Sequence, residues 1–210
     1  MTTIYVNKDK ELPERKTHDL YETERNLIVA AYDYEIPDKR SLKVLDIGAG
    51  DGRWGEEVKW INKDVYLVGV EIDPNRERPL GFNEWYNCDF LTWETDEKFD
   101  LIVANPPYYK AEEIIRKAWN MLANDGSMIM LLRLAFQAGS DDRGVVKGRY
   151  QSLWNEIYPY QVKICSRRPS FYDGGTNGTD YGVYYWSKDA EGKCIGIPRQ
   201  WTVKLMNYDR

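Results

Sequence analysis

Apolar residues occur in short unbroken runs along the first two thirds of the chain. Four of these runs have the length and composition of strands that are buried on both faces: 42–47 (LKVLDI), 65–70 (VYLVGV), 99–104 (FDLIVA) and 127–134 (SMIMLLRL). Helical spacing of apolar residues is found in three segments: 23–34, 54–61 and 112–122. This alternation predicts an α/β fold with a mostly parallel central sheet and helices on both faces.

The last third of the chain has a different pattern. Strands are predicted at residues 162–165, 182–186 and 201–205, after a short helix at 151–157. Because glycine-rich loops join these strands and long helices are lacking, we expect an antiparallel C-terminal hairpin added to the parallel sheet. Residues 1–16 are polar and predict an N-terminal extension, which leaves residues 17–210 as a single domain.

A glycine-rich loop follows the first predicted strand. The stretch VLDIGAGDG places Gly48, Gly50 and Gly52 at alternate positions, directly before a predicted helix. Glycines allow a sharp turn and a close approach of the backbone to a ligand, and the helix N-terminus offers free amides. Asp46 precedes the loop and would repel a pyrophosphate, but it would pair with an ammonium group. The loop therefore favours S-adenosylmethionine over a dinucleotide as the cofactor.

Acidic residues also follow the next two strand positions. Glu71 ends the second predicted strand and is placed to accept hydrogen bonds from both hydroxyls of a ribose, with Ile72 beside it to pack on adenine. Asp89 lies near another predicted strand end and is expected to accept from the adenine amino group, with Phe90 stacking nearby. We therefore predict Glu71, Ile72, Asp89 and Phe90 as cofactor-binding residues.

The strand at residues 99–104 runs directly into the sequence Asn-Pro-Pro-Tyr. The side-chain oxygen of Asn105 and the carbonyl of Pro106 form two acceptors, which suit an amino group with two hydrogens. Tyr108 adds a flat ring for stacking on a base, a role that needs the ring and not the hydroxyl. Accepting both N–H bonds localises the nitrogen lone pair for attack on a methyl group held beside it. We predict Asn105, Pro106 and Tyr108 as catalytic residues, with Asn105 also contacting the cofactor.

The combination of the glycine loop with Asn-Pro-Pro-Tyr about 60 residues later resembles the amino-group methyltransferases, especially DNA adenine-N6 methyltransferases. The resemblance covers roughly residues 17–135. It implies a Rossmann-like class I methyltransferase fold and S-adenosylmethionine as the methyl donor. It also implies that Asp46, Gly48 and Gly50 bind the methionine part of the cofactor, and that residues 18–23 close over it, with Tyr21 and Thr23 as contacts.

The tail of the chain is similar to that of small phage-type adenine methyltransferases. This resemblance implies recognition loops within residues 136–180, because no separate target-recognition domain is visible. It also implies a set of residues that contact the target base or strand: Pro107, Tyr109, Arg133, Arg149, Arg168 and Phe171.

Composition and charge narrow the possible partners. The net charge of −5 argues against a generally basic nucleic-acid-binding surface, but residues 133–168 carry seven cations against three acids. The aromatic share of 14% fits either ordinary packing or stacking on bases. Three widely spaced cysteines and a single histidine predict neither a disulfide framework nor a metal site. No apolar run has the roughly 18 residues of a membrane helix.

The sequence thus predicts a cytoplasmic enzyme that methylates the N6 amino group of adenine in DNA. A monomer is favoured, although no pattern in the sequence bears on the oligomeric state. Asn-Pro-Pro-Tyr also suits other planar amino groups, such as a base in RNA or a glutamine amide in a protein. A fourth alternative is a non-catalytic module that binds S-adenosylmethionine or a nucleic acid.

Overall fold

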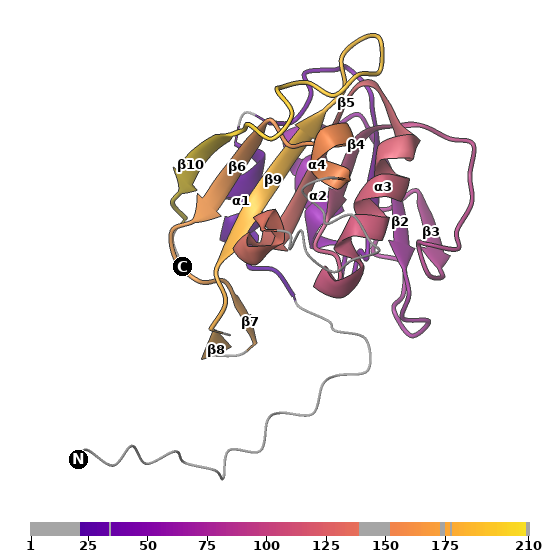
Figure 1. Ribbon diagram of the computed structural model, residues 1–210. Helices are drawn as coiled ribbons and strands as arrows, with labels where there is room; N and C mark the ends of the chain where they lie inside the picture. The colour runs from indigo at the N-terminus through magenta and orange to yellow at the C-terminus, as the bar shows by residue number, and fades with distance from the viewer. Residues whose placement is uncertain (1–21, 34, 139–151, 173–174, 177, 209–210) are drawn as a thin grey trace, which may run out of the picture.

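The computed structural model describes residues 22–33, 35–138, 152–172, 175–176 and 178–208. Its centre is an eight-stranded sheet with the order β10-β6-β9-β5-β4-β1-β2-β3 (Figure 1). The strands of this sheet are β1 Leu42–Ile47, β2 Val65–Glu71, β3 Glu84–Asn87, β4 Phe99–Ala104, β5 Leu122–Arg133, β6 Gln161–Cys165, β9 Tyr181–Ser187 and β10 Thr202–Met206. A separate two-stranded ribbon is formed by β7 (Ser170–Tyr172) and β8 (Gly175–Thr176).

One strand runs against the others. β9 is antiparallel to both of its neighbours, β5 and β6, whereas every other pair of neighbours in the sheet is parallel. The predicted α/β sheet with an antiparallel C-terminal part is confirmed. Within this part, β10 lies beyond β6 at the edge of the sheet and pairs parallel with it. The connection at residues 188–201 passes the end of β6, because both the last residues of β9 and the first residue of β10 lie beside Gln161.

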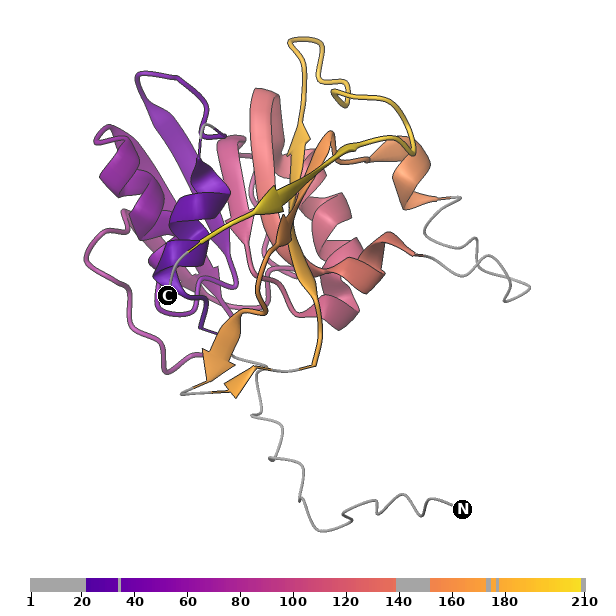
Figure 2. The ribbon, with the colours of Figure 1, turned by 90° about the vertical axis from the view of Figure 1, so that its left-hand side faces the viewer.

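Helices cover both faces of the sheet, as predicted. The helices are α1 (Arg25–Tyr32), α2 (Arg53–Ile61), α3 (Ala111–Met121) and the short α4 (Leu153–Glu156), with 3₁₀ turns η1 (Tyr108–Lys110) and η2 (Leu134–Gln137). Figure 2 shows α1 and α2 on one side of the sheet and α3 and α4 on the other. None of the helices within the described ranges is long and apolar enough to cross a membrane.

Two hydrophobic clusters lie against the two faces of the sheet. Along β4, Ile102 and Ala104 belong to the cluster that packs under α3 and α4, whereas Leu101 and Val103 belong to the cluster under α1 and α2. This alternation follows from the two-residue period of a strand. All four side chains are fully buried, which explains why β4 is almost continuously apolar in sequence.

The register of the parallel strands brings their carboxyl ends to one edge of the sheet. Ile47 of β1 lies opposite Val70 of β2 on one side and opposite Ala104 of β4 on the other. The residues that follow these strands are the glycine loop, Glu71 with Ile72, and Asn105. The connection after β1 leads to β2 on one side, whereas the connection after the neighbouring β4 leads to β5 on the other side. Open α/β sheets bind ligands in the crevice at such a point.

Candidate functional site

The glycine loop between β1 and α2 has a backbone that side chains rarely adopt. Gly48, Gly50 and Gly52 have φ angles of +63°, +58° and +84°, which lie in the left-handed region. A Cβ atom on Gly48 would meet nothing within 4 Å, and one on Gly50 would touch only the Gly48 carbonyl at 4.0 Å. The loop therefore presents bare backbone to open space at the edge of the sheet, which is the surface that a bound cofactor needs.

Gly52 has a different role because it is packed. It stands directly before α2, and a Cβ atom there would lie 2.6 Å from the Phe82 ring and 2.8 Å from Pro79. Both contacts come from the segment between β2 and β3. Gly52 therefore lets this segment close against the start of α2.

Replacing Gly52 with alanine is expected to lower the free energy of unfolding by about 2–4 kcal/mol, because it combines a strained φ with overpacking against Phe82. Chemical denaturation measures this loss. Gly178→Ala is the matched control, since Gly178 is exposed and its Cβ would enter open space. Equal stability of the two variants would contradict the packing role of Gly52.

Glu71 connects the glycine loop to the end of β2. Its side chain is buried; one carboxylate oxygen accepts from the Gly50 amide at 2.7 Å and the other from the Asp73 amide at 2.9 Å. Glu71 also lines a hollow at the sheet edge, which is bounded by Glu22, Thr23, Gly48, Ala49, Gly50, Asp51, Arg53, Trp54, Glu71, Ile72, Arg76, Asn105 and Pro107. We call this the donor hollow. It brings together the predicted residues Thr23, Gly48, Gly50, Glu71, Ile72 and Asn105.

Asp46, although the structure describes it, is not one of the residues that line the donor hollow. It is 1% exposed, and one of its carboxylate oxygens accepts from the Gly55 amide of α2 at 2.9 Å. Burial raises the pKa of Asp46 well above its ordinary value, the Gly55 hydrogen bond opposes this rise, and the Glu71 charge adds to it. The structure thus shows Asp46 fastening the start of α2 behind the loop. Its contact with a cofactor ammonium group stays a prediction.

Asp89 and Phe90 also lie outside the donor hollow. One Asp89 oxygen accepts from the Leu91 amide at 2.9 Å and the other from Lys110 Nζ at 3.2 Å. Burial pushes the pKa of Asp89 upward, but the Leu91 amide and the Lys110 charge outweigh it and leave the pKa below its ordinary value. Phe90 is 5% exposed and packs in the cluster under α3. Their contacts with the cofactor adenine stay predictions.

The Asn105 carboxamide is held from two sides. Its Nδ2 donates to Thr23 Oγ1 at 3.1 Å, and its Oδ1 accepts from the Tyr108 hydroxyl at 3.0 Å. Pro107 joins Asn105 in the donor hollow, whereas Pro106 is buried. Because the Tyr108 hydroxyl bonds to Asn105, the residue contributes more than the flat ring that the sequence suggested.

A second hollow lies on the other side of the Asn-Pro-Pro-Tyr turn. It is lined by Tyr108, Tyr109, Leu132, Arg133, Ala135 and Phe136 and has a volume of about 250 Å³. We call this the acceptor hollow. The Arg133 guanidinium carbon lies 4.9 Å from the centre of the Tyr108 ring, and Tyr109 is 76% exposed. Three of the predicted substrate or catalytic residues, Tyr108, Tyr109 and Arg133, therefore meet at one place.

Other predicted substrate contacts are not brought to this place. Arg168 is exposed and pairs with Asp180 at 3.0 Å. Phe171 is buried and packs edge-on against Tyr181, with 5.1 Å between the two ring centres. Tyr21 and Arg149 lie outside the described residues.

The basic segment at residues 133–168 is largely neutralised where the structure describes it. Lys163 pairs with Glu35 at 3.1 Å and Arg167 with Glu24 at 2.7 Å. Arg143 and Lys147 lie outside the described residues. The local excess of cations in the sequence therefore does not by itself indicate a basic face.

Sequence reasoning missed four charged residues that line the donor hollow: Glu22, Asp51, Arg53 and Arg76. One carboxylate oxygen of Glu22 lies 3.2 Å from Arg53 Nη2, and the other lies 3.9 Å from Arg76 Nη2. Arg53 directly follows the glycine loop, and its place there was a usable signal. Glu22 and Arg76 are distant from the motifs along the chain, and no sequence pattern singles them out.

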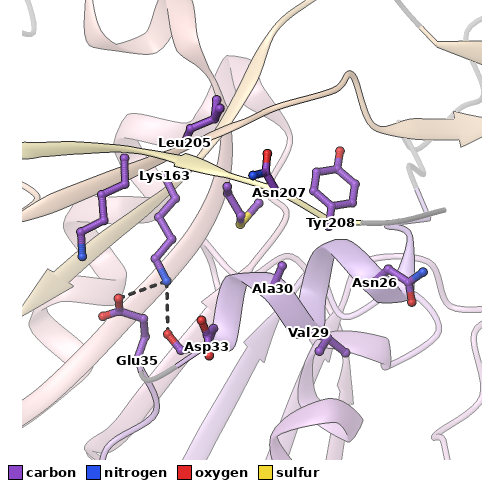
Figure 3. A pocket seen from close by; sticks show the side chains of 11 residues that line it. Asn26, Val29, Ala30, Asp33, Glu35, Lys163, Leu205, Asn207 and Tyr208 are labelled. Carbon is purple, nitrogen blue, oxygen red and sulfur yellow. Dashed lines mark hydrogen bonds and ion pairs between the residues drawn. The ribbon is translucent and has the colours of Figure 1, made fainter.

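A larger cavity of about 700 Å³ lies elsewhere, between α1 and β10. Figure 3 shows Lys163 in this cavity, reaching Glu35 and the main-chain carbonyl of Asp33. Burial pushes the pKa of Glu35 upward, but hydrogen bonds from Tyr160 and Gln161 and the Lys163 charge leave it lowered. None of the residues predicted for the site lines this cavity. Its described polar groups tie α1 to β6.

Sequence comparison finds methyltransferases among the similar proteins. The chain is 34% identical over 110 residues to the type II methyltransferase M.CvrRI of Paramecium bursaria Chlorella virus XZ-6E, covering 51% of this chain and 29% of that protein. It is 40% identical over 67 residues to the type II methyltransferase M.TthHB8I of Thermus thermophilus, covering 31% of this chain and 16% of that protein. A release factor glutamine methyltransferase of Bacillus anthracis is 28% identical over 121 residues, covering 53% and 41% of the two chains. The aligned regions thus span less than half the length of each relative.

Solved structures share the fold at low sequence identity. A dimethyladenosine transferase from Plasmodium falciparum superimposes with a TM-score of 0.58 and 19% identity, covering 81% of this chain and 64% of that one. The N-methyltransferase NodS from Bradyrhizobium japonicum WM9 gives a TM-score of 0.55 and 18% identity, covering 79% and 96%. The predicted Rossmann-like class I methyltransferase fold is confirmed.

The family comparison covers most of the residues that line the two hollows. Residues 34–140 match the methyltransferase small domain, about half of the chain, and this region includes the glycine loop, Glu71 and the Asn-Pro-Pro-Tyr turn. The chain therefore belongs to the methyltransferase small domain family.

Proposed function

We propose that the protein transfers a methyl group from S-adenosylmethionine to the N6 amino group of adenine in DNA. One observation carries this proposal: the Asn-Pro-Pro-Tyr turn lies between two hollows. Asn105 and Pro107 line the donor hollow, and Tyr108 and Tyr109 line the acceptor hollow. A transfer reaction between two bound molecules needs such an arrangement, with one wall shared by both sites.

The donor hollow has the groups that S-adenosylmethionine needs. The bare backbone at Gly48 and Gly50 leaves room for the methionine part, and the buried Glu71 carboxylate would hold the ribose hydroxyls with lone pairs that its two amide partners do not use. Ile72 is 45% exposed and would pack against the adenine. When bound, the cofactor supplies an electrophilic methyl group on a positively charged sulfur.

The acceptor nitrogen is activated by the turn itself. Asn105 Oδ1 accepts a hydrogen bond from Tyr108, and as a carboxamide oxygen it would also accept one hydrogen of the substrate amino group. The Pro106 carbonyl would accept the other hydrogen. Two fixed acceptors hold the nitrogen lone pair on the side of the donor hollow, and they stabilise the positive charge that develops as the nitrogen is methylated.

Adenine in DNA is the acceptor that the similarities favour. Two relatives, at 34% and 40% identity, are type II methyltransferases. A base within a duplex would have to swing out to reach the acceptor hollow, where the Tyr108 ring would stack on it. Within the proposed recognition region 136–180, Leu153 and Trp154 of α4 and residues 161–163 of β6 are buried in the core, so these side chains would not contact DNA.

A glutamine amide in a protein is the second candidate acceptor. The described cations Lys163, Arg167 and Arg168 are paired with acids, and the net charge is −5. A protein substrate needs no basic surface, and the release factor glutamine methyltransferase matches over 53% of this chain. An amide also offers a flat NH₂ group to the same two acceptors.

Incubation with methyl-labelled S-adenosylmethionine and DNA, RNA or protein tests the proposal. Nucleoside analysis should find N6-methyladenine in the DNA arm. Affinity for DNA should fall steeply with salt if several phosphates are contacted. Label in glutamine or in RNA alone would replace DNA adenine as the substrate, and the absence of label in every arm would refute the activity.

Replacing Tyr108 tests both of its contributions. Tyr108→Ala removes the ring and is expected to reduce kcat/KM roughly 10–100-fold, the contribution of stacking on one base. Tyr108→Phe keeps the ring but loses the hydrogen bond to Asn105, and a loss of roughly 2–10-fold is expected. Steady-state kinetics measure both. Tyr66→Phe, which removes an exposed hydroxyl on β2, is the control, and wild-type kinetics for Tyr108→Phe would show that the hydroxyl has no role.

A further inference from the structure

Thr23 links three parts of the chain at the shared wall of the two hollows. It immediately precedes the segment that starts α1, and its side chain is 3% exposed. Thr23 Oγ1 accepts from Trp54 Nε1 of α2 at 3.1 Å and from Asn105 Nδ2, after β4, at 3.1 Å. The hydroxyl therefore contacts the carboxamide on which the proposed chemistry depends.

The donors around Thr23 determine how that hydroxyl is used. An indole N–H can only donate, so the Thr23 oxygen must act as an acceptor toward Trp54. Its second lone pair accepts the hydrogen bond that Asn105 Nδ2 donates. On the other side of the carboxamide, the Tyr108 hydroxyl donates to Oδ1. The nitrogen end of Asn105 is thereby held toward α1 and α2, and the oxygen end toward Tyr108.

The orientation of Asn105 matters because its two ends have nearly the same shape and opposite hydrogen-bonding character. In the observed orientation an oxygen faces the side of Tyr108, which lines the acceptor hollow. After a flip of the carboxamide, an NH₂ group would face the substrate NH₂ group. Two donors would then meet, and the substrate nitrogen would lose one of its two acceptors.

We propose that Thr23 is a positioning residue that keeps the Asn105 oxygen directed toward the acceptor substrate. The inference rests on the proposed function only in taking Asn105 Oδ1 as an acceptor for the substrate amino group. It assigns Thr23 a role beyond the cofactor contact predicted from sequence. Both lone pairs of its hydroxyl accept from the chain's own donors, so only the hydroxyl hydrogen is left for a cofactor.

Thr23→Val and Thr23→Ser test the role. Valine has nearly the same shape but no hydroxyl, and we expect kcat to fall about 10-fold while the cofactor Kd stays within about 2–3-fold of wild type. Serine keeps the hydroxyl and should restore kcat to within about 2-fold of wild type. Single-turnover kinetics and calorimetry with the cofactor measure these two quantities separately.

The same Thr23 substitution in an Asn105→Asp variant tests the orientation of the residue-105 side chain separately. In Asn105→Asp, both ends of the side chain are oxygens, so a flip changes nothing. Thr23→Val should therefore reduce kcat much less in the Asn105→Asp background than in the wild type. A structural role of Thr23 would give the same reduction in both backgrounds. If Asn105→Asp has no measurable turnover, the kcat values of Thr23→Val and Thr23→Ser in the wild-type background decide whether Thr23 has the positioning role.

The outcomes separate this inference from the proposed function. An unchanged kcat in Thr23→Val, or a loss confined to cofactor Kd, would overturn the positioning role while DNA methylation by the wild type still stands. If the wild type methylates RNA or a glutamine amide instead, the same variants are measured on that substrate, because the requirement for an acceptor oxygen is the same. If Thr23→Val does not fold, Trp54→Phe removes the other donor to Thr23 and should lower kcat by a larger factor than it weakens cofactor binding, to which Trp54 contributes as part of the donor hollow; an unchanged kcat there would contradict the inference.

Discussion

Asn105→Ala is expected to reduce the rate of methyl transfer by at least about 10²–10³-fold, the usual effect of removing one fixed group that stabilises the developing charge in a transition state. The variant loses the side-chain acceptor between the two hollows, while Glu71 and the glycine loop keep their hydrogen bonds. The cofactor Kd should therefore change only a few-fold. Single-turnover assays with labelled cofactor measure the first quantity, and calorimetry measures the second.

Asn120→Ala is the matched control for this prediction. Asn120 lies exposed on α3, and its side chain is remote from both hollows. The control should have wild-type kinetics. If Asn105→Ala retained most of its activity, the Asn-Pro-Pro-Tyr turn would not be the catalytic site, and the acceptor hollow would lose its assigned role.

Glu71→Ala is expected to weaken cofactor binding by about 100-fold. Hydrogen bonds to a charged group contribute about 1.5–3 kcal/mol each, and the variant removes the carboxylate that we assign to the ribose hydroxyls. It also releases the Gly50 and Asp73 amides, so the glycine loop loses its anchor to the end of β2. Calorimetric titration with S-adenosylmethionine measures the loss.

Glu77→Ala provides the comparison for Glu71. Glu77 belongs to the same connection between β2 and β3, carries the same charge and is exposed. Its removal should leave the cofactor Kd unchanged, which separates a direct contact from a general change in charge. A Glu71→Ala variant that binds the cofactor as tightly as the wild type would contradict the assignment of the donor hollow.

The sheet could be predicted because its strands are buried on both faces. The unbroken apolar runs of β1, β2 and β4 agree with the observed strands to within one residue at each end. The pairing of β10 could not be predicted in the same way. Its residues are mostly exposed, and the direction in which it joins β6 depends on how the preceding connection crosses the sheet.

Parts of the donor hollow could be predicted for a related reason. Gly48, Gly50, Glu71 and Asn105 stand directly after strands, and parallel strands end at the same edge of a sheet. Asp46 satisfies the same motif, yet its side chain points to the amide of Gly55. Position after a strand identifies which residues reach the edge, but it does not show which way each side chain turns.

The charge of the folded surface could not be predicted from the charge of one sequence segment. Residues 133–168 are basic in sequence, but the acids that neutralise Lys163 and Arg167 are Glu35 and Glu24, more than 120 residues earlier in the chain. Electrostatic pairing depends on distance in space, and a window of sequence contains only local neighbours.

The sequence by itself determined the class of fold, the glycine loop and the Asn-Pro-Pro-Tyr turn, because each depends on local backbone preferences and on periodic burial. The tertiary structure shows that this turn contributes to two hollows, which we assign to the methyl donor and to the acceptor. It also brings Trp54 and Asn105 together at the Thr23 hydroxyl, although 82 residues separate Thr23 from Asn105 along the chain. Hydrogen bonds require atoms to come within about 3 Å, and only the folded chain brings such distant residues that close.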